Sequence, residues 1–153
     1  MISIRRSLCS YRSLLAAGFV AVGLAACGTM SSSNVVSTKT QMTGAQEVPA
    51  VATPGTGTFE SKFDKTTSML SWKLSYSGLT GPAVAAHLHG PAAMGSNTGV
   101  VVPFPNPISS GMEGSSTLTA AQAADYMAGK WYVNVHTAAN KGGEIRGQVT
   151  PGM

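Results

Sequence analysis

Apolar and polar residues alternate along most of the chain beyond about Lys39, a pattern typical of strands that bury one face. The alternation predicts strands at residues 59–63, 70–76, 84–89, 99–104, 112–118, 131–136 and 144–149. Turn-forming residues separate these runs, and the chain contains 18 Gly and 8 Pro. Short strands at this spacing predict an all-β fold, either a Greek-key β-sandwich or a barrel.

One segment departs from the alternation. Residues 119–128 read TAAQAADYMA, which favours a helix. Thr119 can serve as the N-cap, Gln122 stands three positions later as in a capping box, and Gly129 follows the last helical residue. The sequence therefore predicts one short helix within the β-domain.

The first residues have a different character. Arg5, Arg6 and Arg12 precede an uncharged apolar run at residues 14–26. This run is shorter than the roughly 20 residues that a membrane-spanning helix needs. The combination is typical of a secretory signal peptide. Its end, LAAC at residues 24–27, resembles the lipobox of bacterial lipoproteins.

The lipobox resemblance implies that residues 1–26 are removed and that Cys27 is acylated, which would anchor the chain to a membrane. Gly28 after the cysteine favours the outer membrane by the same resemblance. Residues 27–38 then form the lipidated Cys and a flexible tether, and residues 39–153 form the β-domain. We expect a lipid-anchored location in the bacterial cell envelope, facing the periplasm or the surface. The alternative is an ordinary signal peptide with a chance cysteine.

Charge and cysteine content exclude several functions. The net charge of +4 comes from ten Lys and Arg against six acids, and removing the three N-terminal Arg leaves seven against six, or +1. A nucleic-acid partner is therefore not expected. Cys9 lies in the signal segment and Cys27 is assigned to lipid, so no thiol remains for a disulfide or a metal. Motifs for serine nucleophiles, phosphate loops and paired carboxylates are also missing, which favours binding over enzymatic turnover.

The chain contains three histidines: His87, His89 and His136. Positions two apart on a strand point to the same face, about 6–7 Å apart. The parity of 131–136 places Val133 and Val135 in the core and His136 on the outer face. Three imidazoles that meet on one face can hold one ion, with metal–nitrogen bonds of about 2 Å. The alternative is three solvated side chains.

The outer-face pattern extends to other residues. In 84–89 the core positions are expected to be Val84, Ala86 and Leu88, and in the last strand Glu144, Arg146 and Gln148 are expected to face outward. Neutral imidazoles suit copper, zinc or nickel, and the affinity order favours Cu(II). Met94 can offer a thioether to Cu(I), or it is an exposed loop residue. Arg146 is either an anion-guiding cation or part of a surface salt bridge to Glu47 or Glu144, and Glu144 is a candidate for orienting a ligand histidine.

Four segments resemble the chordin-type (CHRD) domain: MTGAQEVPA at 42–50, AHLHGPA at 86–92, WYVNVHT at 131–137 and GGEIRGQV at 142–149. Together they frame residues 40–150. The resemblance implies an all-β, immunoglobulin-like or barrel-like domain that lies outside the cytoplasm, and it implies little about activity.

The order of the histidines is also similar to that in copper–zinc superoxide dismutases, which use a His-x-His pair, a later strand ending in His, and a C-terminal Arg beside copper. This resemblance implies that His87, His89 and His136 are copper ligands and that Arg146 guides anions. The chain has no fourth histidine, so the zinc subsite of that family is not expected.

Three functional hypotheses follow. The leading one is an envelope-anchored domain that binds a single copper-like ion, with zinc as the alternative, through His87, His89 and His136. The second is a metal-free adhesion or scaffold module that recognises a protein or a polysaccharide. The third is a copper-only, superoxide dismutase-like enzyme.

Overall fold

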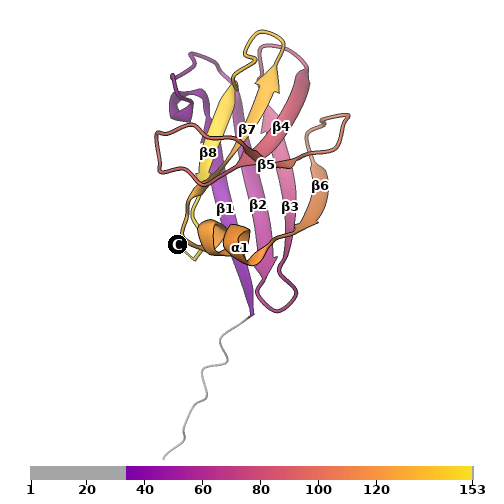
Figure 1. The fold of residues 1–153 in the computed structure, drawn as a ribbon. Coiled ribbons are helices and arrows are strands. Elements are labelled where there is room, and N and C mark those ends of the chain that lie inside the picture. Colours follow the sequence, from indigo (N-terminus) through magenta and orange to yellow (C-terminus); the bar gives the residue numbers. More distant parts are fainter. Residues whose placement is uncertain (1–33, 153) are drawn as a thin grey trace, which may run out of the picture. The chain divides into compact units, whose positions relative to one another are not determined.

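The structure, a computed structural model, describes residues 34–152. The predicted signal peptide, the lipobox with Cys27 and the first part of the tether lie outside the described residues. Eight antiparallel strands form one sheet in the order β5-β4-β7-β8-β1-β2-β3-β6 (Figure 1). The elements are β1 Val35–Thr43, η1 Gly44–Gln46, β2 Thr56–Asp64, β3 Met69–Ser77, β4 Ala83–His89, β5 Val100–Pro103, β6 Met112–Thr117, α1 Ala120–Met127, β7 Trp131–Thr137 and β8 Ile145–Val149. The predicted all-β class with one short helix is confirmed.

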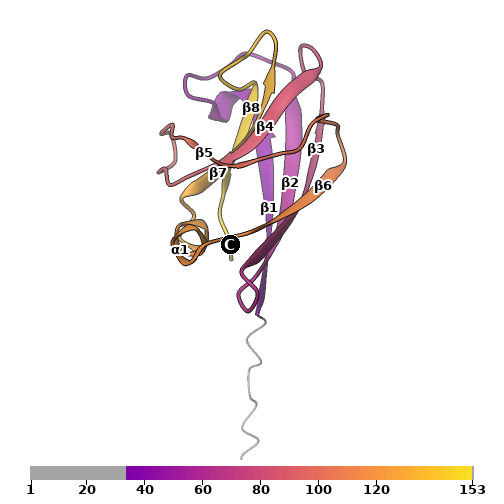
Figure 2. The same cartoon turned by 45° about the vertical axis from the view of Figure 1, so that its right-hand side comes forward.

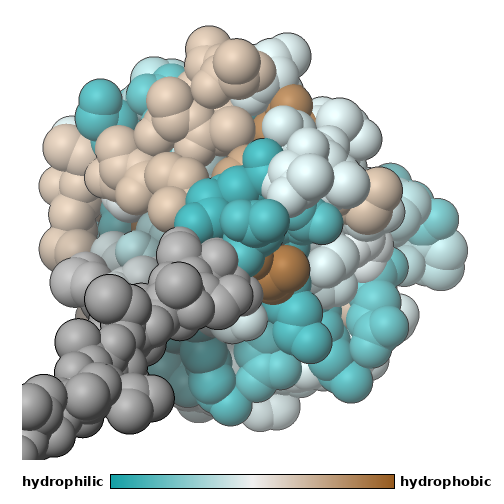
Figure 3. Space-filling view, turned by 90° about the horizontal axis from the view of Figure 1, so that it is seen from below, coloured by the Kyte–Doolittle hydropathy of each residue, from teal (hydrophilic) through white to brown (hydrophobic). Residues whose placement is uncertain are grey.

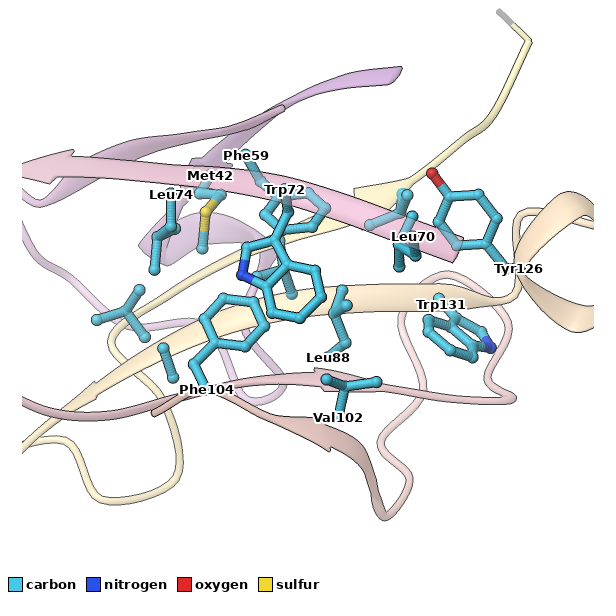
Figure 4. Packing of buried hydrophobic residues seen from close by; sticks show 14 of the residues in the cluster. Met42, Phe59, Leu70, Trp72, Leu74, Leu88, Val102, Phe104, Tyr126 and Trp131 are labelled. Carbon is cyan, nitrogen blue, oxygen red and sulfur yellow. The ribbon is translucent and has the colours of Figure 1, made fainter. Parts of the chain in front are cut away.

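The sheet folds over into two layers, β5-β4-β7-β8 and β1-β2-β3-β6 (Figure 2). The layers join where β8 meets β1, at a ladder pair between Thr43 and Arg146. Their inner faces enclose the apolar core, in which Trp72 of one layer stacks on Phe104 of the other at 4.9 Å between ring centroids (Figure 4). Because apolar burial is the main stabilising contribution, this core fixes which face of each strand points outward.

The strand patterns locate seven of the eight strands, with two differences. No strand was predicted over β1, which runs from Val35 to Thr43, and its first four residues fall within the predicted tether. Val84, expected in the core, is 50% exposed. The cause is a register shift between Ala83 and Ala85, which inserts Val84 as an extra residue opposite β7. Beyond the shift the alternation resumes, and Ala86 and Leu88 are buried as predicted.

Helix α1 closes one end of the core. Thr119 is its N-cap, and the reciprocal hydrogen bonds with Gln122 complete the predicted capping box. On its inner side Tyr126 is fully buried, and its hydroxyl lies 2.9 Å from Ser61 Oγ on β2. The helix is thus attached to the sheet by both packing and a buried hydrogen bond.

The outer face of β4, β7 and β8 is covered rather than solvated. Asn134, Arg146 and Glu144 are 2%, 1% and 0% exposed. The 90–99 and 138–144 loops cover this face, and Asn97 Nδ2 in the first loop donates to Val48 O at 2.6 Å. These side chains point away from the core as expected, but they are buried and not exposed. Alternation along a strand shows which side chains share a face, but it does not show whether a loop covers that face.

Viewed from the end that carries α1, hydrophilic and apolar residues are mixed over the surface (Figure 3). Within residues 34–152, no helix has the length and apolar content required to cross a membrane.

Candidate metal centre

The three histidines lie together on the covered outer face. β4 pairs with β7, with His87 opposite Asn134 and His89 opposite Tyr132. One ring nitrogen from each histidine lies within 4.8 Å of the others, so the three residues could hold a metal ion. His89 and His136 are each 8% exposed, whereas His87 is only half-buried, which leaves its side of the cluster the most open.

Backbone carbonyl groups define which ring nitrogen carries the proton. His89 Nδ1 lies 3.0 Å from Thr98 O, and His136 Nδ1 lies 2.9 Å from Lys141 O. A carbonyl oxygen can only accept, so both Nδ1 atoms must donate. In the neutral imidazoles the lone pairs are then on Nε2. His136 Nε2 lies 3.0 Å from His87 Nδ1, so these nitrogens converge.

Asn134 places an oxygen in the same cluster. Its Oδ1 lies 2.9 Å from His136 Nε2 and 3.1 Å from His89 Nε2. Its Nδ2 makes a long 3.5 Å hydrogen bond to Gly142 O. The alternation of residues 131–136 places Asn134 on the face of His136, although no role was predicted for it. The signal was available, because Asn134 and His136 are two positions apart on one strand.

Burial keeps His87 and His136 neutral. It lowers the pKa of His87 to about 4, with smaller contributions from the nearby His136 and His89. Burial also lowers the pKa of His136, although the hydrogen bond to the Lys141 carbonyl acts to raise it. Because an unperturbed histidine titrates near pH 6.5, these two imidazoles are uncharged at neutral pH and can offer lone pairs.

Tyr132 links the cluster to Arg146. The rings of His89 and Tyr132 are stacked at 4.7 Å with an interplanar angle of 2°. The Arg146 guanidinium carbon lies 3.5 Å from the centroid of the same Tyr132 ring. Its Nη1 donates to Asn97 Oδ1 and its Nη2 to Ser96 O, both at 2.8 Å. Arg146 therefore holds the 90–99 loop against the sheet.

The expected surface salt bridge of Arg146 is not formed. Among the residues that the structure describes, the salt bridges are Lys39–Glu60, Lys73–Glu113 and Lys130–Asp125. The buried guanidinium is committed to the loop, and burial lowers its pKa, against the raising effects of Tyr132 and Glu47. Met94, the suggested thioether donor, lies in the same loop and is 75% exposed.

Glu144 is placed to organise the 138–144 loop and not to orient a ligand histidine. Burial acts to raise its pKa, but hydrogen bonds outweigh this and lower the pKa to about 2. The donors to its carboxylate are Thr53 Oγ1, Thr80 N, Thr80 Oγ1, Thr137 Oγ1 and Asn140 Nδ2, at 2.6–3.1 Å. The backbone carbonyls of Thr98 and Lys141, and not Glu144, orient the histidine rings. A backbone carbonyl is present at every residue, so the sequence does not mark these two.

Glu47 lies behind Asn134. It is 6% exposed, and burial raises its pKa to about 7, although Arg146, the Val48 backbone and the Asn134 amide act to lower it. Its buried Oε1 makes no hydrogen bond of good geometry. Gly143, at φ +129°, leaves the space that both side chains use, because a Cβ there would collide with Glu47 Oε1 and Asn134 Nδ2.

The described strands belong to a recognised domain type. The family model for the CHRD domain matches residues 38–149, so the chain belongs to the CHRD domain family. The match spans the strands that bear all three histidines. No curated protein and no solved structure matches the chain.

Proposed function

We propose that this CHRD domain binds one transition-metal ion through His87, His89 and His136. The observation that carries the proposal is the orientation of the imidazoles. Two of them use Nδ1–H to bind fixed carbonyls, and their Nε2 lone pairs face a common region that also contains an amide oxygen. The contacts between Asn134 Oδ1 and the Nε2 atoms of His89 and His136 pair acceptors with acceptors, which is unfavourable, and a cation would reverse this.

Copper is the proposed ion, with zinc as the alternative. Neutral imidazoles suit both, and the affinity of such sites for divalent ions peaks at copper. Storage or sequestration is favoured over turnover, because Arg146 is buried and holds a loop instead of facing the open side of the cluster. The dismutase-like alternative therefore has no guiding cation at this position.

A titration of the purified protein tests the metal site. Wild type should bind one Cu(II) per chain, and each of His87→Ala, His89→Ala and His136→Ala should weaken binding strongly, as measured by calorimetry. Lys141→Ala is the matched control, because it retains the backbone carbonyl that binds His136. Unchanged stoichiometry and affinity in all three histidine variants would place the ion elsewhere and refute this site. Absence of Cu(II) binding by wild type would leave the metal-free adhesion or scaffold module.

We further propose that the protein is located in the bacterial cell envelope, where a lipid attached to Cys27 anchors it to a membrane. The support is the basic and apolar segment before LAAC at 24–27 and the short polar stretch between Cys27 and β1. Metabolic labelling with a palmitate analogue should mark the wild type and not Cys27→Ser. Equal labelling of the two proteins, or recovery of both in the soluble fraction, would contradict the anchor.

A further inference from the structure

We infer that Asn134 is the fourth ligand of the metal ion, through Oδ1; this inference rests on the proposed function. The three histidines by themselves provide only nitrogen donors for a metal ion. The Asn134 side chain is 2% exposed, and its oxygen lies among the same nitrogens. The site would then provide three nitrogen donors and one oxygen donor.

Three of the separations among the four atoms match those of ligands around one ion. Two ligands about 2.1 Å from a metal, at angles between about 90° and 109°, are separated by about 3.0–3.4 Å. The separations from Asn134 Oδ1 to the two Nε2 atoms are 2.9 and 3.1 Å, and that from His87 Nδ1 to His136 Nε2 is 3.0 Å. The short contacts thus run from His87 to His136, from His136 to Asn134 and from Asn134 to His89.

In the amide orientation of the structure, hydrogen bonding does not account for the contacts to Asn134. Its Oδ1 is an acceptor, and in the neutral rings the facing Nε2 atoms of His89 and His136 are also acceptors, since their Nδ1 atoms donate to carbonyls. The amide Nδ2 donates to Gly142 O at 3.5 Å, and reversing the amide would replace this hydrogen bond by a contact between two oxygens. The Gly142 carbonyl thus favours the orientation with the amide oxygen toward the histidines.

The donor set has a consequence for selectivity. All four ligands are neutral, and a carboxamide oxygen is a hard donor, whereas Cu(I) prefers soft thiolate and thioether ligands. Met94 is 75% exposed, and the four proposed donor atoms are imidazole nitrogens and an amide oxygen. The site should therefore hold Cu(II) or Zn(II) in preference to Cu(I).

The test compares Cu(II) binding and electron paramagnetic resonance spectra of wild type, Asn134→Leu and Asn134→Asp. Leucine has a similar volume but no oxygen, so affinity should fall about tenfold or more, and the copper hyperfine parameters should change. Aspartate retains an oxygen and should retain binding. Asn140→Leu is the matched control, because the Asn140 amide bonds to Thr80, Thr137 and Glu144 and not to the histidines.

If Asn134→Leu binds Cu(II) with wild-type affinity and an unchanged spectrum, the inference is overturned while the three-histidine site stands. If wild type itself binds no metal, both proposals fail.

A measurement on unmodified protein covers the case in which Asn134→Leu does not fold. On addition of Zn(II), the side-chain carbonyl carbon signal of Asn134 should shift with the three imidazoles, and that of Asn140 should not. Shifted imidazoles with an unmoved Asn134 signal would overturn the inference.

Discussion

Arg146 lies on the ring of Tyr132, with its guanidinium carbon 3.5 Å from the ring centroid. Tyr132 stacks in turn on His89, so side chains from β8, β7 and β4 form one row across the sheet. The 90–99 loop crosses this row and is bonded at both ends of it. Ser96 and Asn97 accept from Arg146, and Thr98 accepts from His89.

Arg146→Met should therefore weaken copper binding although Arg146 is not a ligand. The variant keeps most of the apolar stem but loses two charge-assisted hydrogen bonds, each worth about 1.5–3 kcal/mol in general. The released loop would no longer hold the Thr98 carbonyl on His89. Calorimetric titration and hydrogen exchange of residues 90–99 measure both effects. Lys130→Met, at an exposed lysine, is the control. Unchanged affinity and exchange would show that the loop is held by other contacts.

Gly143→Ala should destabilise the apo protein by about 1–3 kcal/mol and weaken metal binding. The residue has φ +129°, and an added Cβ would displace Glu47 and Asn134. Gly142→Ala is a sharp control, because a Cβ at this neighbouring position meets nothing within 4 Å. Chemical denaturation and copper titration provide the comparison. Equal losses in the two variants would indicate a general effect of loop stiffness.

Acid should destabilise the protein through Glu144. Its pKa is about 2 in the folded chain against 4.5 ordinarily, so the stabilisation is present above pH 4.5 and is lost as the pH falls toward 2. The size is about 2–3 kcal/mol. Glu144→Gln should be less stable than wild type at pH 7 and should approach it at pH 3 in denaturation experiments. Glu113→Gln, at an exposed side chain, is the control. A gap that stays constant with pH would contradict this role.

Glu47 has the opposite dependence. Its pKa is raised from 4.5 to about 7, so the folded state loses stability as the pH rises between these values. Glu47→Gln removes the ionisation, and the stability of the variant relative to metal-free wild type should increase between pH 4.5 and 7. Thermal melts of both proteins with a chelator measure this difference. The histidine contributions cancel in the comparison, since both proteins contain them. A difference that does not change with pH would show that Glu47 ionises freely.

The sequence predicted the elements with a strong local signal. Alternation located seven of the eight strands but not β1, the capping residues located α1, and parity placed each of the three histidines on the outer face of its strand. The extra residue at Val84 was not predictable, because a bulge depends on pairing with a partner strand.

The immediate surroundings of the site were the least predictable part. Arg146 and Glu144 were expected at the surface, and the structure buries both under loops whose sequences have no periodicity. The carbonyls of Thr98 and Lys141 orient two imidazoles, but every residue has a carbonyl, so no residue type marks them. Asn134 could have been selected, because its position two residues before His136 places it on the same face.

His87 and His136 are 49 positions apart in the chain and 3.0 Å apart in space. An ion bound between them would act as a removable cross-link that closes a long loop, and such closures stabilise by restricting the unfolded chain. Binding to the folded state alone adds stability that increases with the free ion concentration. The lifetime of the folded protein would then follow the copper supply of its compartment, and a chelator would shorten it without altering a covalent bond.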